Sequence, residues 1–393
     1  MHRRAFLISL CMVAVAVRLA TGGTLLSQGG PAFVLSSDDG DAYDAAARWQ
    51  AFGTPIVMTE RMGGKWDPVV PVEARWPQGY WLLLAAQYRV FGSAAYASTL
   101  VVQAVLAAGG VLAVFGLAAR VFSEPAARVA AVGQALSSTG VYLSSALYAE
   151  SLYLPMLLGG LALIALAVEA TSAARPRCLL ALGAGAAFGV AEATRPLALP
   201  VFAMAVVWAA VATRPTSERR RIVLVLGAGF CLALLPLVLH DLATLGRVAV
   251  FTAGGAEAVR DQSAHGEGLF ERALTMFITG GWAPLGEPLI SSLGPLPTLF
   301  GRLGEWLLAV VGGVWLLFVS RRRGVTRVGW LLAGGAAAVI GPSLLVGLPL
   351  VRYRAAADPI FIICMVAGAL ALNVRRFPRG TPKGHVRGAV LVR

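Results

Sequence analysis

Residues 152–168 read LYLPMLLGGLALIALAV, and residues 97–119 read ASTLVVQAVLAAGGVLAVFGLAA; neither stretch contains a charged residue. A helix needs about 20 mostly apolar residues to cross the hydrocarbon core of a bilayer. The apolar residues run continuously in both stretches and do not alternate with polar ones as they would in a half-buried strand. Both stretches therefore predict membrane-spanning helices.

Composition supports this fold class for the whole chain. Of the 393 residues, 58% are hydrophobic and 13% are charged, whereas soluble domains carry about 25% charged residues. This balance excludes a soluble globular enzyme and a disordered chain. We expect one all-α polytopic membrane domain over residues 1–393.

The apolar pattern recurs along the chain and predicts ten spans, at residues 5–22, 97–119, 129–147, 152–168, 178–194, 197–213, 222–239, 299–320, 328–348 and 359–374. The stretch 77–91 is short, begins with aromatic residues and carries Arg89, so it predicts an interfacial helix. Two long loops, 23–96 and 240–298, face one side of the membrane, and a basic tail follows at 375–393.

The distribution of charge predicts the orientation. With Met1 inside, the inner segments carry 20 Lys and Arg against three Asp and Glu, which is a strong positive-inside pattern. Counting 77–91 as a span would place the later arginine clusters outside. We therefore expect both termini in the cytoplasm, an integral protein of the cytoplasmic membrane, and long loops facing outward. We expect the first span to be an uncleaved membrane anchor and not a cleaved signal peptide, because Arg18 lies late in the span and Thr21-Gly22-Gly23 is a poor site for signal-peptide cleavage.

The net charge of +13 does not predict nucleic-acid binding, because no basic patch is interleaved with aromatic residues. The four cysteines lie inside or at the edges of apolar stretches, without a CxxC motif or a nearby histidine, and are expected to pack as small hydrophobic residues; they are Cys11, Cys178, Cys231 and Cys364.

The first outer loop contains four carboxylates within seven residues, Asp38, Asp39, Asp41 and Asp44. Mutual repulsion raises the pKa of some members of such a cluster, and a carboxylate of raised pKa is suited to act as general base towards a hydroxyl group. A solvated acidic turn and a calcium loop are the alternatives, although Trp49 occupies the place where an EF-hand loop would need a glutamate ligand.

A second acidic candidate is Glu150, the only charged residue between Arg128 and Glu169. It lies where the third span leaves the membrane, on the same side as the aspartate cluster. An acid at that depth is costly to keep ionised and is a functional candidate by default. The alternative is a structural role as a helix cap.

Three arginines oppose the positive-inside trend, because Arg195, Arg352 and Arg354 lie at the outer ends of spans. Arginine binds phosphate in a two-pronged geometry that lysine does not match, so these residues are candidates for holding a lipid phosphate. The alternative is ion pairing, of Arg195 with Glu192 and of Arg354 with Asp358.

Five motifs, in this order, carry a resemblance to a known family: Asp39-x-x-x-Tyr43-x-x-x-Ala47, Arg75-Trp76-Pro77-x-Gly79-Tyr80, Leu147-Tyr148-Ala149-Glu150-Ser151-Leu152-Tyr153, Thr194-Arg195-Pro196, and Arg352-Tyr353-Arg354 with Asp358-Pro359. The sequence resembles the GT-C glycosyltransferases, in particular bacterial relatives of the protein O-mannosyltransferase and aminoarabinose transferase group. The resemblance covers nearly the whole chain. The first loop reads Asp38-Asp39-Gly40-Asp41 where the family often has Asp-Glu, which leaves two candidates for the base.

The resemblance implies transfer of a hexose, a mannose-like sugar or a pentose from a polyprenyl-phosphate carrier to an extracytoplasmic protein, lipid or polysaccharide. It implies Asp39 or Asp41 as the base, Glu150 as an orienting acid, and Arg195, Arg352 and Arg354 at the donor phosphate. Substrate contacts are expected from Asp38, Tyr43, Tyr80, Tyr353 and His240. No metal or other cofactor is expected to be required. A lipid-linked-sugar flippase or solute transporter is the alternative function.

Overall fold

The computed structural model describes residues 2–35, 40–54, 77–92, 96–169, 174–213, 216–248, 295–319, 323–346 and 357–373. Every regular element in these ranges is helical: α1 (Arg3–Val34), α2 (Gly40–Phe52), α4 (Gln78–Phe91), α5 (Tyr96–Val121), α6 (Glu124–Leu136), α7 (Ser138–Leu143), α8 (Glu150–Glu169), α9 (Ala174–Thr194), α10 (Ala198–Ala212), α11 (Thr216–Leu245), α14 (Pro295–Val314), the π-helical turn η4 (Trp315–Val319), α15 (Arg323–Val346) and α17 (Asp358–Asn373). The all-α prediction is confirmed.

Five of the described helices are long and apolar enough to cross a membrane: α1, α5, α8, α9 and α11. Four shorter apolar helical stretches, within α10, α14 and η4, α15 and α17, accompany them. The chain is therefore a polytopic integral membrane protein. The stretch predicted as an interfacial helix forms α4, whose 14 residues extend about 21 Å at 1.5 Å per residue, too short to span the membrane.

The prediction of one continuous span over 129–147 is wrong. The helix stops at Leu136, because Ser137 adopts an extended conformation (φ −54°, ψ 118°) and its side chain caps α7 by accepting a hydrogen bond from the Gly140 amide at 3.3 Å. Serine is a preferred N-cap residue because its hydroxyl satisfies a free amide. An average over apolar residues does not detect such a cap.

Arg18 explains how this helix break is tolerated. Its side chain is 2% exposed, and its Nη1 donates to the carbonyl oxygens of Ala135 (2.9 Å) and Ala14 (3.0 Å). Ala135 lies in the last turn of α6, where carbonyl groups lack helical partners and a cation is favoured by the helix dipole. An interrupted helix inside a membrane protein requires this kind of internal partner.

The helix α1 also extends beyond its predicted end at residue 22. It continues to Val34 across a kink, where Gly30 has a positive φ of 61° and precedes Pro31. The carbonyl of Val34 then accepts a hydrogen bond from the Leu147 amide at 3.1 Å. Apart from Gly30 at the kink, the first 12 residues of the predicted outer loop are thus helical, and they end against the segment that precedes α8.

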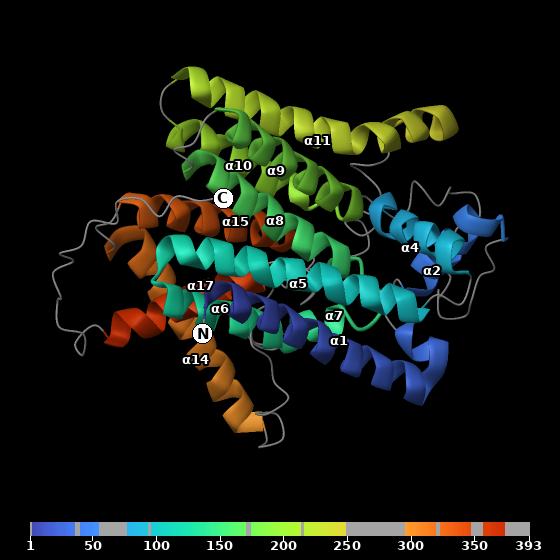
Figure 1. Ribbon diagram of the computed structural model, residues 1–393, viewed down its shortest axis with the longest axis horizontal. Helices are drawn as coiled ribbons and strands as arrows, with labels where there is room; N and C mark the ends of the chain where they lie inside the picture. Colours follow the sequence, from blue (N-terminus) through green and yellow to red (C-terminus); the bar gives the residue numbers. More distant parts are fainter. Residues whose placement is uncertain are drawn as a thin grey trace.

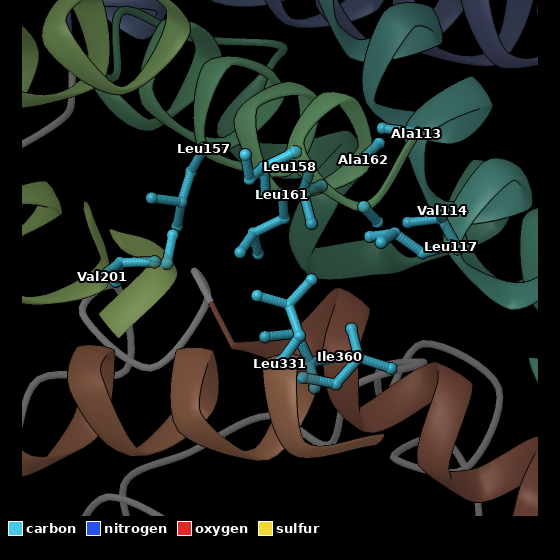
Figure 2. Close-up of a cluster of buried hydrophobic side chains, with 14 of the residues drawn as sticks. Ala113, Val114, Leu117, Leu157, Leu158, Leu161, Ala162, Val201, Leu331 and Ile360 are labelled. Carbon is cyan, nitrogen blue, oxygen red and sulfur yellow. The ribbon is translucent and has the colours of Figure 1, made fainter. Parts of the chain in front are cut away.

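The central helix of the bundle is α8, whose apolar side chains form the core. Figure 2 shows its Leu157, Leu158 and Leu161 between side chains of α5, α10, α15 and α17, including Leu331 and Ile360. In lipid, helices associate by close packing, because burial from water supplies no further driving force between them. These side chains therefore stabilise the bundle by filling space between its helices.

Glycines bring pairs of helices into backbone contact. A Cβ atom on Gly185 of α9 would overlap the Leu226 carbonyl oxygen of α11, and one on Gly229 of α11 would overlap the Leu182 carbonyl oxygen of α9. The crossing is therefore closed from both sides by residues without side chains, as small-residue interfaces in membranes are.

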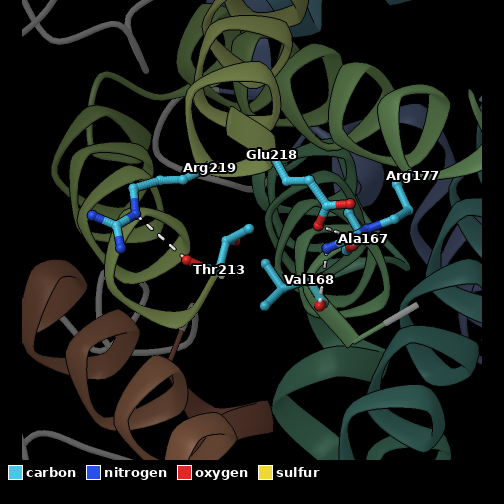
Figure 3. Close-up of polar contacts among 6 residues, drawn as sticks. All are labelled: Ala167, Val168, Arg177, Thr213, Glu218 and Arg219. Carbon is cyan, nitrogen blue, oxygen red and sulfur yellow. Dashed lines mark hydrogen bonds and ion pairs between the residues drawn. The ribbon is translucent and has the colours of Figure 1, made fainter. Parts of the chain in front are cut away.

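One end of the bundle is held by ion pairs. Arg177 of α9 contacts Glu218 of α11 at 2.6 Å, and it donates to the carbonyls of Ala167 (3.0 Å) and Val168 (3.4 Å) near the C-terminus of α8 (Figure 3). The same figure shows Arg219 donating to the Thr213 carbonyl at 3.4 Å. At the opposite end, α2 and α4 pack together against the bundle (Figure 1).

Candidate functional site

Glu150 and Arg195 form an ion pair at the end of the bundle that carries α2 and α4. Nη2 of Arg195 lies 2.7 Å from Oε1 of Glu150, and the two residues are 8% and 2% exposed. Glu150 begins α8, where the helix dipole favours a negative charge. Arg195 directly follows α9 and precedes Pro196, which cannot continue the helix. Two residues 45 positions apart in the sequence thus meet at the ends of two neighbouring helices.

Glu192, the alternative partner expected for Arg195, has a separate function in the fold. Its Oε2 accepts a hydrogen bond from the Leu199 amide at 2.7 Å. Leu199 is the second residue of α10, and the first amides of a helix need an acceptor outside it. Glu192 therefore caps α10 and fixes the turn in which Arg195 lies.

A chain of hydrogen bonds connects α4 to the start of α8. The Tyr80 hydroxyl donates to Oε1 of Gln103 at 2.9 Å, and the Ser151 hydroxyl donates to the same oxygen at 3.1 Å. Nε2 of Gln103 donates to the Ala146 carbonyl at 2.9 Å. Gln103 is fully buried, so this one amide joins α4, α5 and α8 immediately beside Glu150. No role for Gln103 was predicted from the sequence. A single amide side chain within an apolar span is nevertheless a signal of a functional or connecting role.

Tyr43 and Tyr80 pack against each other at the junction of α2 and α4. Their ring centroids lie 5.0 Å apart in an edge-on arrangement, and the residues are 2% and 0% exposed. Burial raises the pKa of the Tyr80 hydroxyl well above its ordinary value, so this hydroxyl stays protonated. The structure places both tyrosines in the packing of the α2–α4 unit, and their substrate contact stays a prediction.

Asp44 is fully engaged in a polar network within this unit. Its Oδ1 accepts from the Tyr88 hydroxyl at 2.6 Å and its Oδ2 accepts from Nε of Arg48 at 2.8 Å. Arg48 also donates to the Tyr96 hydroxyl at 2.8 Å. Burial raises the pKa of Tyr88, and the negative charge of Asp44 raises it further. This aspartate therefore anchors α2 to α4 and is poorly placed to accept a proton from a substrate.

Asp41 is the candidate base that the structure places. It lies in the first turn of α2 with its side chain half-buried, two residues before Tyr43. Among the residues described, no group of three or more acidic, histidine or cysteine side chains is arranged to hold a metal ion. The predicted residues Asp38, Asp39, Arg352, Tyr353 and Arg354 lie outside the described ranges.

The start of α4 is fixed to both α9 and α11. Nε2 of Gln78 donates to Oδ1 of Asp241 at 2.5 Å, and both residues are fully buried. A Cβ atom on Gly79 would lie 2.8 Å from the carbonyl carbon of Ala193, so only glycine permits this approach to the end of α9. His240, a predicted substrate contact, precedes Asp241 and is half-buried.

These contacts place Glu150, Arg195 and the α2–α4 unit at one end of the bundle, as the sequence motifs require. The sequence matches no protein-family model and no curated protein. Three solved structures of the oligosaccharyltransferase of Archaeoglobus fulgidus are similar to this chain. The apo form aligns with a TM-score of 0.60 at 15% identity, over 95% of this chain and 51% of that one.

The second structure, AglB with an inhibitory peptide and a dolichol-phosphate, aligns with a TM-score of 0.59 at 14% identity, with the same coverage. The third, which is tethered to an acceptor peptide containing the NVT sequon, gives 0.60 at 14% with the same coverage. The chain has a GT-C fold. The resemblance seen in the sequence motifs is thereby confirmed for the fold. This chain covers 51% of the length of the oligosaccharyltransferase.

Proposed function

We propose that this chain is a membrane glycosyltransferase that moves a sugar from a polyprenyl-phosphate carrier to an acceptor on the extracytoplasmic side. The observation that carries the proposal is the buried Glu150–Arg195 ion pair at the end of a GT-C fold. A guanidinium group that an acid holds in one orientation at that place suits a reaction in which a phosphate gains negative charge.

The similar structures support the class of donor. The archaeal protein of the same fold has been solved with a dolichol-phosphate and with peptides bound. A polyprenyl phosphate is the corresponding carrier that we propose here. The positive-inside pattern of the sequence supports the orientation that we propose, in which the α2–α4 end of the bundle lies outside the cytoplasm and both termini lie in the cytoplasm. The membrane that we propose is the cytoplasmic membrane.

The proposed reaction is a single displacement. Asp39 or Asp41 takes the proton of the acceptor hydroxyl, and the acceptor oxygen forms a bond to the anomeric carbon of the sugar. The bond from that carbon to the carrier phosphate breaks, and its electron pair stays on the phosphate oxygen. Attack from the face opposite the phosphate inverts the anomeric configuration. Arg352 and Arg354 neutralise the departing phosphate, a type of stabilisation that contributes several kcal/mol.

The Glu150–Arg195 pair has a positioning role in this mechanism. Because the two charges nearly cancel, the pair offers oriented hydrogen-bond donors and little net charge. We propose that Glu150 holds the Arg195 guanidinium in one orientation towards the carrier phosphate, which a planar fork of donors requires. The sequence resemblance implies the same role at the donor phosphate for Arg195, Arg352 and Arg354. The role proposed here for Arg195 differs, because Glu150 is its counter-ion.

The transporter alternative would use a charged residue deep in the bundle. Arg18 is such a residue, but its donors go to the Ala14 and Ala135 carbonyls in the repair of a helix break. These two contacts explain the burial of Arg18 by a structural role. The buried charge of Arg18 therefore gives the transporter function no specific support.

The test uses the purified protein in lipid vesicles with radiolabelled polyprenyl-phosphate hexoses and pentoses, and with cell-envelope fractions as acceptors. We expect transfer by the wild type, loss of transfer in Asp39→Asn or Asp41→Asn, and strong loss in Glu150→Gln. Glu169→Gln is the matched control, because Glu169 pairs with Arg120 at 2.9 Å at the other end of α8. Absence of transfer from every donor, or full activity in Glu150→Gln, would refute the proposal.

Mass spectrometry of the cell envelope in a deletion strain identifies the substrates. Loss of one sugar from a glycan, lipid or protein, together with accumulation of its prenyl-phosphate form, is the expected result. An unchanged envelope with normal donor levels would count against this role.

A further inference from the structure

A small cavity lies beside Glu150 and is lined by residues of α1, α5, α6, α7 and α8. Its volume is about 20 Å³, and its polar lining comprises Arg18, Gln134, Ser144, Glu150 and Ser151. A cavity of about 10–15 Å³ is large enough for one water molecule. The space is therefore large enough for one bound water molecule.

Apart from Oε1 of Glu150, which is ion-paired with Arg195, three polar atoms of this lining have no hydrogen-bond partner among the described residues. They are Nε of Arg18, Oε1 of Gln134 and Oε2 of Glu150, and the three residues are 2%, 7% and 2% exposed. A buried polar group without a partner costs about 1–3 kcal/mol, and more when it is charged. The hydrogens of the two serine hydroxyls are already engaged, because Ser144 donates to the Gly140 carbonyl at 2.7 Å and Ser151 shares its hydrogen between the Tyr148 carbonyl at 2.7 Å and Oε1 of Gln103 at 3.1 Å.

The three atoms match the bonding capacity of water in number and in kind. Arg18 Nε is a donor, while Gln134 Oε1 and Glu150 Oε2 are acceptors. A water molecule accepts at its oxygen and donates through two hydrogens, and buried waters typically make about three hydrogen bonds to groups of this type. We propose that one water molecule occupies the cavity, accepting from Arg18 and donating to Gln134 and Glu150.

This water completes the surroundings of the Glu150 carboxylate. One oxygen contacts Arg195 directly at 2.7 Å, and the other is joined through water to Arg18. A guanidinium group buried among membrane helices thereby gains a carboxylate as its counter-charge, which a buried charge needs. The helix break at Ser137 and the candidate site are linked through this water.

Hydroxyl-radical labelling by X-ray radiolysis tests for the water directly, because a buried side chain is oxidised only if a water molecule lies beside it. Leu158 lines the cavity and Leu161, one turn further along α8, does not; they are 1% and 0% exposed. We expect labelling of Leu158 well above that of Leu161 in the full-length protein. Equal labelling of the two would overturn the proposal.

A variant that fills the cavity provides the second measurement. A Cβ atom on Gly140 would lie 3.5 Å from Nη2 of Arg18 and 3.6 Å from Nε2 of Gln134, so Gly140→Ala adds a methyl group to the cavity wall without a clash. We expect labelling of Leu158 to fall to the level of Leu161. Gly159→Ala is the control, since its Cβ meets nothing within 4 Å, and it should change neither signal.

Unchanged labelling of Leu158 in Gly140→Ala would also contradict the proposal. If Gly140→Ala folds poorly, Gln134→Met is the alternative variant, because it removes one hydrogen-bond acceptor at similar volume. We expect it to lower the labelling of Leu158. Gln87→Met is its control, because Gln87 is an equally buried amide outside the cavity. Labelling reports the water whether or not the chain transfers sugar, so failure of the transferase proposal would remain distinguishable.

Discussion

The replacement Glu150→Gln removes the carboxylate that faces Arg195 and leaves a buried guanidinium group without that counter-charge. The side chains of Arg195 and Glu150 are 10% and 2% exposed, so water replaces the lost partner poorly. Removing one member of a buried ion pair typically costs about 3–5 kcal/mol. We expect a loss of that order in the free energy of unfolding.

A double-mutant cycle separates the ion pair from other effects of the substitution. Arg195→Gln leaves the carboxylate buried instead and should cost a similar amount. The double variant buries neither charge, so its loss should be smaller than the sum of the two single losses by the coupling energy. The coupling energy should therefore lie at the upper end of the usual range, at about 2–3 kcal/mol.

The assay is unfolding of the protein in mixed micelles with a rising fraction of sodium dodecyl sulfate, followed by tryptophan fluorescence. The control cycle uses Arg128 and Glu124, an i,i+4 pair on α6 whose side chains are 28% and 42% exposed. Exposed pairs of this kind contribute about 0.3–0.5 kcal/mol. A coupling energy for Glu150 and Arg195 no larger than that of the control pair would refute the reasoning.

Three further predictions concern packing and anchoring, each measured by the same unfolding assay. Gln78→Leu removes a charge-assisted hydrogen bond to Asp241 and should cost about 1.5–3 kcal/mol; an unchanged midpoint would show that α4 is held elsewhere. Gly185→Val forces a side chain into the backbone of α11 and should abolish folded expression, whereas normal yield would contradict the close crossing. Arg177→Met frees Glu218 and two carbonyls and should destabilise by about 1–3 kcal/mol, with Arg175→Met, an exposed neighbour, as a near-neutral control.

The sequence was sufficient to predict the positions of most helices, because a long run of apolar residues is far more stable as a helix in the bilayer than exposed to water. It was also sufficient to predict α4 as a short helix outside the set of spans. It failed at Ser137, because a helix break depends on a local cap and on a guanidinium group from a helix more than 100 residues away in the sequence. Hydropathy contains neither piece of information.

The candidate site shows the same division. Outward-facing charges drew attention to Glu150 and Arg195, but their direct contact depends on how α8 and α9 lie side by side. Gln103 was overlooked because its importance comes from three partners on different elements. Tyr43 and Tyr80 were expected at a substrate, while their aromatic contact shows them in the packing that holds α2 to α4.

The glycine-lined crossing of α9 and α11 has a mechanical consequence. Because the two backbones touch without intervening side chains, the crossing leaves little space for α9 and α11 to move against each other. Arg195 directly follows α9, and Asp241 lies near the end of α11. The start of α4 contacts both helices, through Gly79 at α9 and Gln78 at α11. We expect any opening that admits the proposed lipid carrier to come from displacement of neighbouring helices, with α9 and α11 keeping their places.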